Sequence, residues 1–360
     1  NMQNEKFKPL YLFFITYMTQ TGIVLFSLPN IIANHFGYNG WIMIIAISVV
    51  VLIHIGLIAI IYSFNKGESI FQAIESFNSK AKMILMPLYI SLSIFWSILS
   101  VTIAKHYVHV MKFLYFPQTD IQWFVLLTLI VTFYLVTRGI VTIAHICTIF
   151  FFLSAPIIFL LFYFVPDFSF LQFSTFLFNE NKDFYGGIIE LYTAFLGFEV
   201  ILFMFPYISK EKSGFKYVFW GHLYTSFVYF IVTIICYGFN SIQQLTRVVY
   251  PVVNLVKYIE FDFIERLDSI IFILFYLKVL ITITMYVWIS LITLKRVVKW
   301  SDNLIVFVLL AVGYLSTLAF VTKKELIFLL SALTKVQLLI SVFLPLLLLI
   351  ITFKKRRSNG

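Results

Sequence analysis

Charged side chains are scarce in this sequence. Of its 360 residues only 12% are Asp, Glu, Lys or Arg, whereas 61% are hydrophobic and the mean hydropathy is +0.99. Soluble globular domains carry about 25% charged residues, so this composition excludes an ordinary water-soluble fold. Cysteine is rarer still: Cys147 and Cys236 indicate neither a disulfide framework nor a metal site. The chain is therefore expected to lie in a lipid bilayer.

Motifs of catalysis are also missing. The sequence contains no hydrolase nucleophile elbow, phosphate-binding loop, zinc-binding helix or dinucleotide fingerprint. His54, His145 and His222 each stand alone in apolar surroundings, which favours packing over metal binding. We expect a protein that is not an enzyme and that has no cofactor or metal. The net charge of +10 does not indicate nucleic-acid binding, because the chain offers no soluble basic surface.

Long apolar runs recur along the whole chain. About 20 apolar residues suffice for a helix to cross a hydrocarbon core roughly 30 Å thick. These runs are apolar on every side, whereas the strands of a membrane β-barrel alternate apolar and polar residues. We expect an all-α polytopic membrane protein, with about ten transmembrane helices near residues 11–33, 41–63, 84–105, 121–136, 140–165, 187–208, 217–239, 269–293, 304–321 and 336–353.

Basic residues are distributed unevenly between the loops. If the N-terminus is cytoplasmic, sixteen Lys and Arg residues lie on the cytoplasmic side and nine on the other, and such an excess is typical of cytoplasmic loops. We expect residues 1–360 to form a single membrane domain with both termini cytoplasmic and a basic tail at 354–360. The long loop at 241–268 is expected to form an outer-loop helix, as a connector packed on the surface or as a lid over a vestibule.

Two glycines interrupt apolar runs at related positions. Gly22 and Gly197 lie 175 positions apart (197 − 22), close to half of the chain. In transporters built from two related halves, helices interrupted by glycine at corresponding positions face each other near the membrane centre and form the substrate site. The spacing predicts a five-plus-five inverted repeat, residues 9–165 and 186–353, with breaks in its first and sixth helices.

Three ionisable residues lie inside the predicted spans: Glu190, Glu199 and Lys278. A charge at the centre of a membrane helix costs roughly 2.5 to 3.5 kcal/mol on insertion scales, so such residues are paired or functional. Glu199 follows the second break and has three candidate roles: holding a ligand ammonium, carrying a proton, or accepting hydrogen bonds from the broken helix ends. Lys278 shares a helix face with Thr282 and Tyr286, and it either pairs with a carboxylate such as Glu199 or acts directly.

The segments around both breaks resemble a known transporter superfamily. The segment from Tyr192 to Glu199 reads Tyr-Thr-Ala-Phe-Leu-Gly-Phe-Glu, and it is similar to the broken sixth helix of the amino acid–polyamine–organocation transporters. The segment from Thr21 to Ile23 resembles the break in their first helix. Proton-coupled members often carry a lysine in the fifth helix, but the span at 140–165 has none. This departure favours sensing over pumping.

A closer resemblance is to the B-subunit family of spore germinant receptors, also called endospore germination permeases. It covers essentially the whole chain. Its most specific portion is Tyr-Pro-Val-Val-Asn-Leu-Val-Lys at 250–257, followed by Phe-Ile-Glu-Arg-Leu-Asp at 263–268. This resemblance implies a nutrient germinant sensor in the spore inner membrane, with an A subunit and a C-subunit lipoprotein as partners. The alternative is an independent secondary amino acid transporter.

The two breaks together suggest how a ligand would be held. The half-helix N-terminus after the first break offers free N–H groups and a positive dipole to a carboxylate. Carbonyl groups before Gly197, with Glu199, would receive an ammonium, so an L-amino acid suits both ends. Ser97 is assigned to side-chain selectivity, against the alternative that it permits close helix packing. The predicted ligand-binding residues are Thr21, Gly22, Ile23, Ser97, Phe195, Leu196, Gly197, Phe198, Glu199 and Tyr286, with Lys278 as a possible charge partner.

Overall fold

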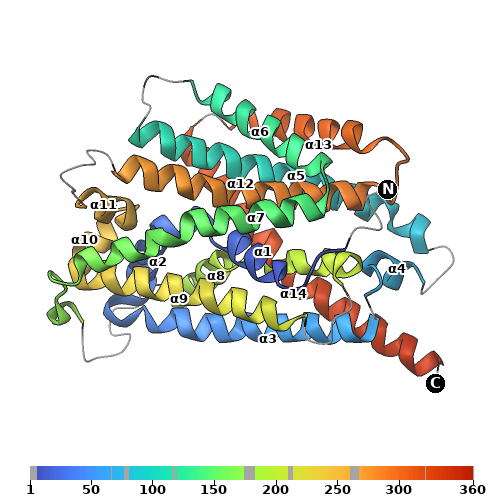
Figure 1. The fold of residues 1–360 in the computed structure, drawn as a ribbon, viewed down its shortest axis with the longest axis horizontal. Helices are drawn as coiled ribbons and strands as arrows, with labels where there is room; N and C mark the ends of the chain where they lie inside the picture. The colour runs from blue at the N-terminus through green and yellow to red at the C-terminus, as the bar shows by residue number, and fades with distance from the viewer. Residues whose placement is uncertain are drawn as a thin grey trace.

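The fold is a bundle of long helices that run roughly along one common direction (Figure 1). The computed structural model describes residues 6–65, 67–76, 81–115, 118, 120–173, 183–209, 214–259, 267–320 and 322–359. Helices α10 and α11 lie at one end of the bundle, and α4 and the end of α14 lie at the other (Figure 1). The two ends are named here the α10–α11 end and the α4 end.

The long apolar runs form helices as their composition predicts. The uninterrupted ones are α3 (Ile42–Asn65), α5 (Ala81–Leu114), α6 (Ile121–Thr137), α9 (Lys216–Phe239), α12 (Leu267–Leu294), α13 (Asp302–Thr317) and α14 (Lys323–Asn359). Helix α7 (Ile140–Ser154) continues as the 3₁₀ segment η2 (Ala155–Phe164). The change follows from Pro156, which has no N–H to continue an α-helical hydrogen-bond ladder.

Two runs are interrupted where the glycines predict. The first divides into α1 (Tyr11–Gln20) and α2 (Val24–Phe36), and the second into α8 (Phe184–Ala194) and the 3₁₀ segment η4 (Phe198–Tyr207). In the described part of the chain, seven helical runs are long and apolar enough to span a membrane, and the bent pair α1–α2 makes an eighth. With the shorter apolar helices α6 and α13 the total is ten, which agrees with the expected number.

Helix α14 is longer than expected at both ends. It begins at Lys323 instead of near residue 336 and continues through the expected tail to Asn359. Its early start has a local cause, because Thr322 and Glu325 cap each other. The Glu325 N–H donates to the Thr322 hydroxyl at 3.3 Å, and the Thr322 N–H donates to the Glu325 carboxylate at 3.0 Å.

The long loop at 241–268 contains two short helices instead of the single helix expected. They are α10 (Ile242–Arg247) and α11 (Pro251–Lys257). Pro251 occupies the first turn of α11 and disfavours helical backbone at Tyr250, so the chain cannot pass from α10 to α11 as one helix. Residues 260–266 of this loop lie outside the described residues. Whether the segment covers a vestibule stays a prediction.

The broken helices lie at the centre of the bundle. Helix α1 contacts α7, α9, α12 and η4. In η4 every side chain from Phe198 to Phe205 is buried. At the α4 end, the segment before α1 pairs with the end of η4: the Phe7 N–H donates to the Tyr207 carbonyl at 3.0 Å, and the Ser209 N–H donates to the Phe7 carbonyl at 3.1 Å. Both interrupted runs are therefore held by neighbours along their length.

Candidate ligand site at the two helix breaks

The first break leaves backbone N–H groups without partners. Helix α1 ends at Gln20, α2 begins at Val24, and the two halves are bent by 57°. In the described part of the chain, no acceptor is recorded for the N–H groups of Ile23, which precedes α2, and of Val24, its first residue. Such groups carry the positive end of the helix dipole. The start of α2 can therefore receive an anionic group.

The second break requires a glycine. Gly197 has a φ of +118°, which L side chains rarely adopt. A Cβ added at this position would lie 2.7 Å from the Thr19 carbonyl oxygen in α1. The close approach of the two backbones and the change of direction between α8 and η4 therefore depend on the same residue.

Hydrogen bonds join the two breaks directly. The Gln20 Nε2 donates to the Phe195 carbonyl at 2.8 Å. The Tyr229 hydroxyl of α9 lies 2.7 Å from the Gln20 carbonyl and 2.9 Å from the Ala194 carbonyl. In the described residues no donor is recorded for the carbonyl of Leu196. One carbonyl of the second break thus stays available while its neighbours are occupied.

A cavity of about 80 Å³ lies between the breaks. Of the residues predicted to bind ligand, it is lined by Gly22, Ile23, Leu196 and Tyr286. The lining contains hydroxyl and amide groups but no ionisable side chain other than that of Tyr286. The remaining lining residues are Thr19, Gln20, Val24, Leu99, Ile103, Thr193, Ala194, Val279, Thr282, Leu330, Thr334 and Gln337.

The sequence analysis did not predict several of the residues that line this cavity. Thr193, Thr334 and Gln337 line the cavity, and none of them was among the predicted site residues. Thr334 and Gln337 lie on α14, and the positions of the two helix breaks do not predict that this helix lies beside the site. The available signal was the isolated amide of Gln337 in an apolar helix, since a buried polar side chain in a membrane span requires a partner.

Glu199 accepts hydrogen bonds and does not line the cavity. Its Oε2 accepts from the Gly197 N–H at 2.7 Å, and its Oε1 accepts from the Tyr286 hydroxyl at 2.9 Å and from the Gln337 Nε2 at 2.7 Å. The Gln337 Oε1 in turn accepts from the Trp96 Nε1 at 2.9 Å. Of the three roles considered for this carboxylate, acceptance of hydrogen bonds at the broken helix is the one that the geometry shows.

Lys278 does not pair with Glu199, which corrects the expected charge partner. Its Nζ donates to the Tyr17 hydroxyl at 2.7 Å and lies over the rings of Tyr17 and Phe275 at 4.7 and 4.8 Å. Lys278 precedes Tyr286 by eight residues, about 12 Å along the axis of α12. Because Tyr286 is the α12 residue that reaches Glu199, the lysine lies too far along the helix to share that carboxylate.

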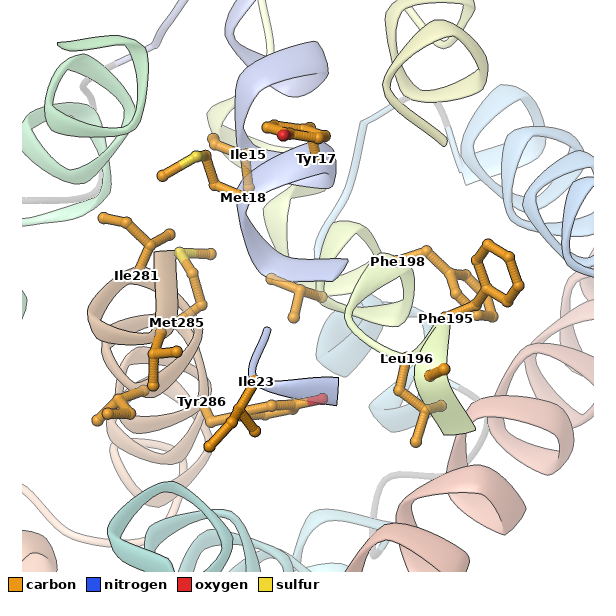
Figure 2. Close-up of a cluster of buried hydrophobic side chains, with 14 of the residues drawn as sticks. Ile15, Tyr17, Met18, Ile23, Phe195, Leu196, Phe198, Ile281, Met285 and Tyr286 are labelled. Carbon is orange, nitrogen blue, oxygen red and sulfur yellow. The ribbon is translucent and has the colours of Figure 1, made fainter. Parts of the chain in front are cut away.

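Of four other predicted residues, three contact the surrounding helices and Thr21 bonds back to α1. The Ser97 hydroxyl donates to the Leu309 carbonyl of α13, so it packs two helices together, as its alternative interpretation stated. The Thr21 hydroxyl donates to the Tyr17 carbonyl at 2.6 Å. Figure 2 shows the side chains of Phe195 and Phe198 directed away from Ile23 and Tyr286. The ring of Phe195 lies 5.3 Å from that of His222, and the ring of Phe198 is stacked 6.4 Å from that of His54.

Comparison with known proteins identifies the family to which this chain belongs. Residues 6–326 match the model of the family described as spore germination protein. The chain belongs to this family. Its relatives include spore germination protein GerQB of Bacillus cereus, which is 29% identical over 272 residues, covering 73% of this chain and 72% of the relative. Spore germination protein B2 of Bacillus subtilis (strain 168) is 27% identical over 257 residues, covering 69% of this chain and 68% of the relative. The family is one of germination permease-like membrane proteins, not of enzymes.

Solved structures show the same fold in a transporter. The closed conformation of Mhp1, a nucleobase-cation-symport-1 family transporter with bromovinylhydantoin bound, matches with a TM-score of 0.60 and 14% identity, covering 89% of this chain and 74% of that one. The inward-facing conformation of Mhp1 matches with a TM-score of 0.51, covering 92% of this chain and 77% of that one. The spore germination family member thus has a transporter-type fold with a broken first helix, as expected.

Proposed function

We propose that this chain is the nutrient germinant-sensing subunit of a spore germination receptor, and that it binds a small L-amino acid between its two helix breaks. The observation that carries the proposal is the cavity between the breaks. On one side lie the N–H groups of Ile23 and Val24, for which the described part of the chain provides no recorded acceptor, and on the other lies the Leu196 carbonyl. A zwitterion satisfies both. Its carboxylate accepts from the two N–H groups at the positive end of α2, and its ammonium donates to the carbonyl.

The volume and the lining of the cavity limit the size and the polarity of the ligand side chain. Pockets for drug-sized ligands occupy roughly 300 to 1,000 Å³, whereas this one is about 80 Å³. Leu99, Ile103, Val279 and Leu330 contribute apolar walls. An amino acid with a small apolar side chain therefore fits better than a charged or aromatic one. Thr21, Gly197, Phe198 and Glu199 act by shaping the two breaks.

Signalling requires that ligand binding favours one conformation of the bundle. Two segments reach the cavity and also extend to the α4 end: α14, through Thr334 and Gln337, and α12, through Thr282 and Tyr286. We assign them to transmit the change to an A subunit and a C-subunit lipoprotein. The chain would lie in the spore inner membrane with the α4 end facing the cytoplasm, which places both termini on that side.

A test uses the purified chain in detergent, with glycine and each of the nineteen protein L-amino acids added separately. A ligand that binds the native state raises its unfolding temperature by mass action. We expect stabilisation by one or a few amino acids with small apolar side chains and none by their D-enantiomers. Equal responses to all twenty, or none to any, would contradict an amino acid site in this subunit.

A second candidate function is independent secondary amino acid transport. It is favoured by a cavity of about 350 Å³ at the α4 end, lined by Phe203 and Tyr207 of η4, by Trp288 of α12 and by Arg296, which follows α12. Such a cavity would give a released substrate a path away from the central site. Uptake of the stabilising amino acid by sealed liposomes containing this chain alone would support transport. Binding without uptake would support sensing.

A further inference from the structure

The early start of α14 places a lysine inside a membrane-spanning helix. The sequence predicts a span that begins at residue 336, which leaves Lys335 outside it, but the apolar helical run extends from Lys323 to Lys354. Lys335 lies 12 residues after the first of these lysines (335 − 323) and 19 residues before the second (354 − 335). These separations are about 18 and 28 Å along the helix axis. Lys335 is therefore far from both ends of the span.

The contacts of the same turn place Lys335 at the level of the two helix breaks. Gln337 follows it by two residues, about 3 Å along the axis, and donates to the Glu199 carboxylate at 2.7 Å. Glu199 in turn accepts from the N–H of Gly197 at the second break. Broken helices of this kind face each other near the membrane centre. Lys335 thus lies close to the middle of the bilayer and not at its surface.

The side chain of Lys335 lies on the outside of the bundle. Lys335 is exposed, whereas Gln337 and Ser341 on the opposite side of α14 are buried. Helices α3, α4 (Ile70–Glu75), α5 and α8 pack against the remaining surface of α14. The exposed residues that share one side of the helix with this lysine are named here the Lys335 face: Phe328, Ala332, Lys335, Leu339 and Leu346.

No partner of the Lys335 ammonium is recorded among the described residues. Two buried lysines inside the spans differ in this respect. Lys105 donates to two backbone carbonyls at 2.6 and 2.9 Å, and Lys278 donates to the Tyr17 hydroxyl at 2.7 Å. Charged side chains within a membrane span pair with one another or with carbonyls, because the hydrocarbon offers no partner. Lys335 therefore requires a partner from outside the described part of this chain.

Lipid headgroups are too distant to be that partner. A lysine near the end of a membrane helix reaches the headgroups through its flexible stem. The nearer end of this span is about 18 Å away, well beyond the reach of a four-carbon stem. A carboxylate at the same depth, on a neighbouring transmembrane helix, is the group that pairs with the ammonium.

A second copy of this chain does not offer such a carboxylate. If two copies met along the Lys335 face, two ammonium groups would lie opposite each other. The two acidic residues of the α8–η4 run are engaged elsewhere. Glu199 accepts from three donors, and Glu190 lies 3.3 Å from the His35 Nε2. The charge pattern therefore selects a different protein as the partner.

We infer that the Lys335 face docks a transmembrane helix of another protein, and that this helix carries an Asp or Glu side chain at the depth of Lys335. Successive positions of the face are separated by four, three, four and seven residues, the spacing at which two helices pack along a seam. Ala332 lets a partner helix approach closely beside the ammonium. Thr334 and Gln337, on the same turn, line the central cavity, but docking does not depend on a ligand there.

The test uses three synthetic transmembrane peptides that differ at one position. Each is a polyleucine helix with lysines at both ends, a central Glu, Gln or Leu, and one cysteine a turn from the centre. The full chain carries Leu339→Cys, one turn from Lys335, and shares lipid vesicles with each peptide at low density. Cys147 and Cys236 are buried and stay. We expect the Glu peptide to form roughly five- to thirtyfold more disulfide than the others, as one interhelical polar contact predicts.

Variants at the lysine show whether the peptide recognises its charge. Lys335→Leu is expected to remove the preference for the Glu peptide, and Lys335→Arg to keep it. Since the side chain is exposed, Lys335→Leu should unfold at the wild-type temperature. Ile130→Cys, at an exposed position of α6, is the matched control and should show no preference. Equal disulfide yields with the three peptides, or a preference that survives Lys335→Leu, would overturn the inference.

A second measurement determines which protein occupies the face in the native membrane. A photo-cross-linking residue replaces Leu339 in the full chain, and the product is identified by mass spectrometry. We expect a product with a different membrane protein that Lys335→Glu abolishes. Changing an acidic residue in the membrane span of that partner to Lys should then restore it. A product of two copies of this chain, no protein product, or a product that Lys335→Glu leaves intact would overturn the inference.

Discussion

The two helix breaks occupy corresponding positions in the chain but are built differently. At the first, a Cβ added to Gly22 would meet nothing within 4 Å, and among the described residues no acceptor is recorded for the N–H groups of Ile23 and Val24. At the second, a Cβ added to Gly197 would meet the backbone of α1. The carbonyls around it accept from Thr19, Gln20 and Tyr229, and its N–H donates to Glu199.

This difference separates two roles that the glycine spacing alone does not distinguish. The first break leaves space and unpaired donors next to the cavity, so it is suited to meet a ligand. The second break is fixed by its neighbours, so it is suited to keep the cavity in shape. Substitutions at the second break should therefore lower stability, whereas substitutions at the first should change ligand binding.

The largest effect is expected from Gly197→Ala. The substitution forces a side chain into a backbone conformation that costs about 1 to 3 kcal/mol, and its Cβ clashes with the Thr19 carbonyl. We expect unfolding in detergent to become easier by about 3 kcal/mol or more, measured as a large fall in the unfolding temperature. Gly22→Ala is the matched control and should unfold like the wild type. Equal unfolding temperatures for the two variants would contradict the difference between the breaks.

A smaller loss of stability is expected from Glu199→Gln. The new amide keeps one acceptor oxygen but directs its NH₂ group at donors that the carboxylate satisfied. Hydrogen bonds to a charged group are worth roughly 1.5 to 3 kcal/mol, so we expect a loss of about 2 kcal/mol. Gln337→Leu tests the same contact from α14. If the two effects add in the double variant, Glu199 and Gln337 are not coupled, and the account of the second break is wrong.

The smallest effect is expected from Lys278→Met. Methionine keeps the apolar stem and gives up one hydrogen bond to Tyr17 and the contacts with two aromatic rings. Because no carboxylate loses its partner, we expect a change of less than about 1 kcal/mol in unfolding. Had the lysine paired with Glu199, the substitution would leave a buried carboxylate uncompensated, at a cost of about 3 to 5 kcal/mol. The unfolding temperature of this variant distinguishes the two.

Sequence alone predicted the membrane fold and the positions of both breaks. Helices are readable because each span must be apolar for about 20 residues, and glycines at matching positions in two such runs indicate a pair of broken helices. The inverted repeat with boundaries at 9–165 and 186–353 stays a prediction. The start of α14 was missed, because the helix opens with Lys323 and Lys324, which do not read as part of a membrane span.

The residues of the candidate site could be predicted from the sequence only in part. Gly22, Ile23, Leu196 and Tyr286 line the cavity, and their predicted role in ligand binding stays a prediction; the partners of Glu199 and Lys278 were not apparent. Which carboxylate or amide faces which helix depends on how α12 and α14 are rotated against the breaks, and apolar helices give no periodic signal for that rotation. For the same reason Phe198 could not be assigned to packing in advance, whereas packing was already the stated alternative for Ser97.

The central claim is that ligand binds beside Gly22, and one pair of variants tests it most directly. Gly22→Leu places a bulky side chain at the cavity, whereas Gly22→Ala adds only a methyl group with space around it. Both are compared by thermal unfolding with and without the L-amino acid that stabilises the wild type. We predict that both fold and that only Gly22→Leu loses the stabilisation. Full stabilisation of Gly22→Leu would contradict a ligand site between the breaks.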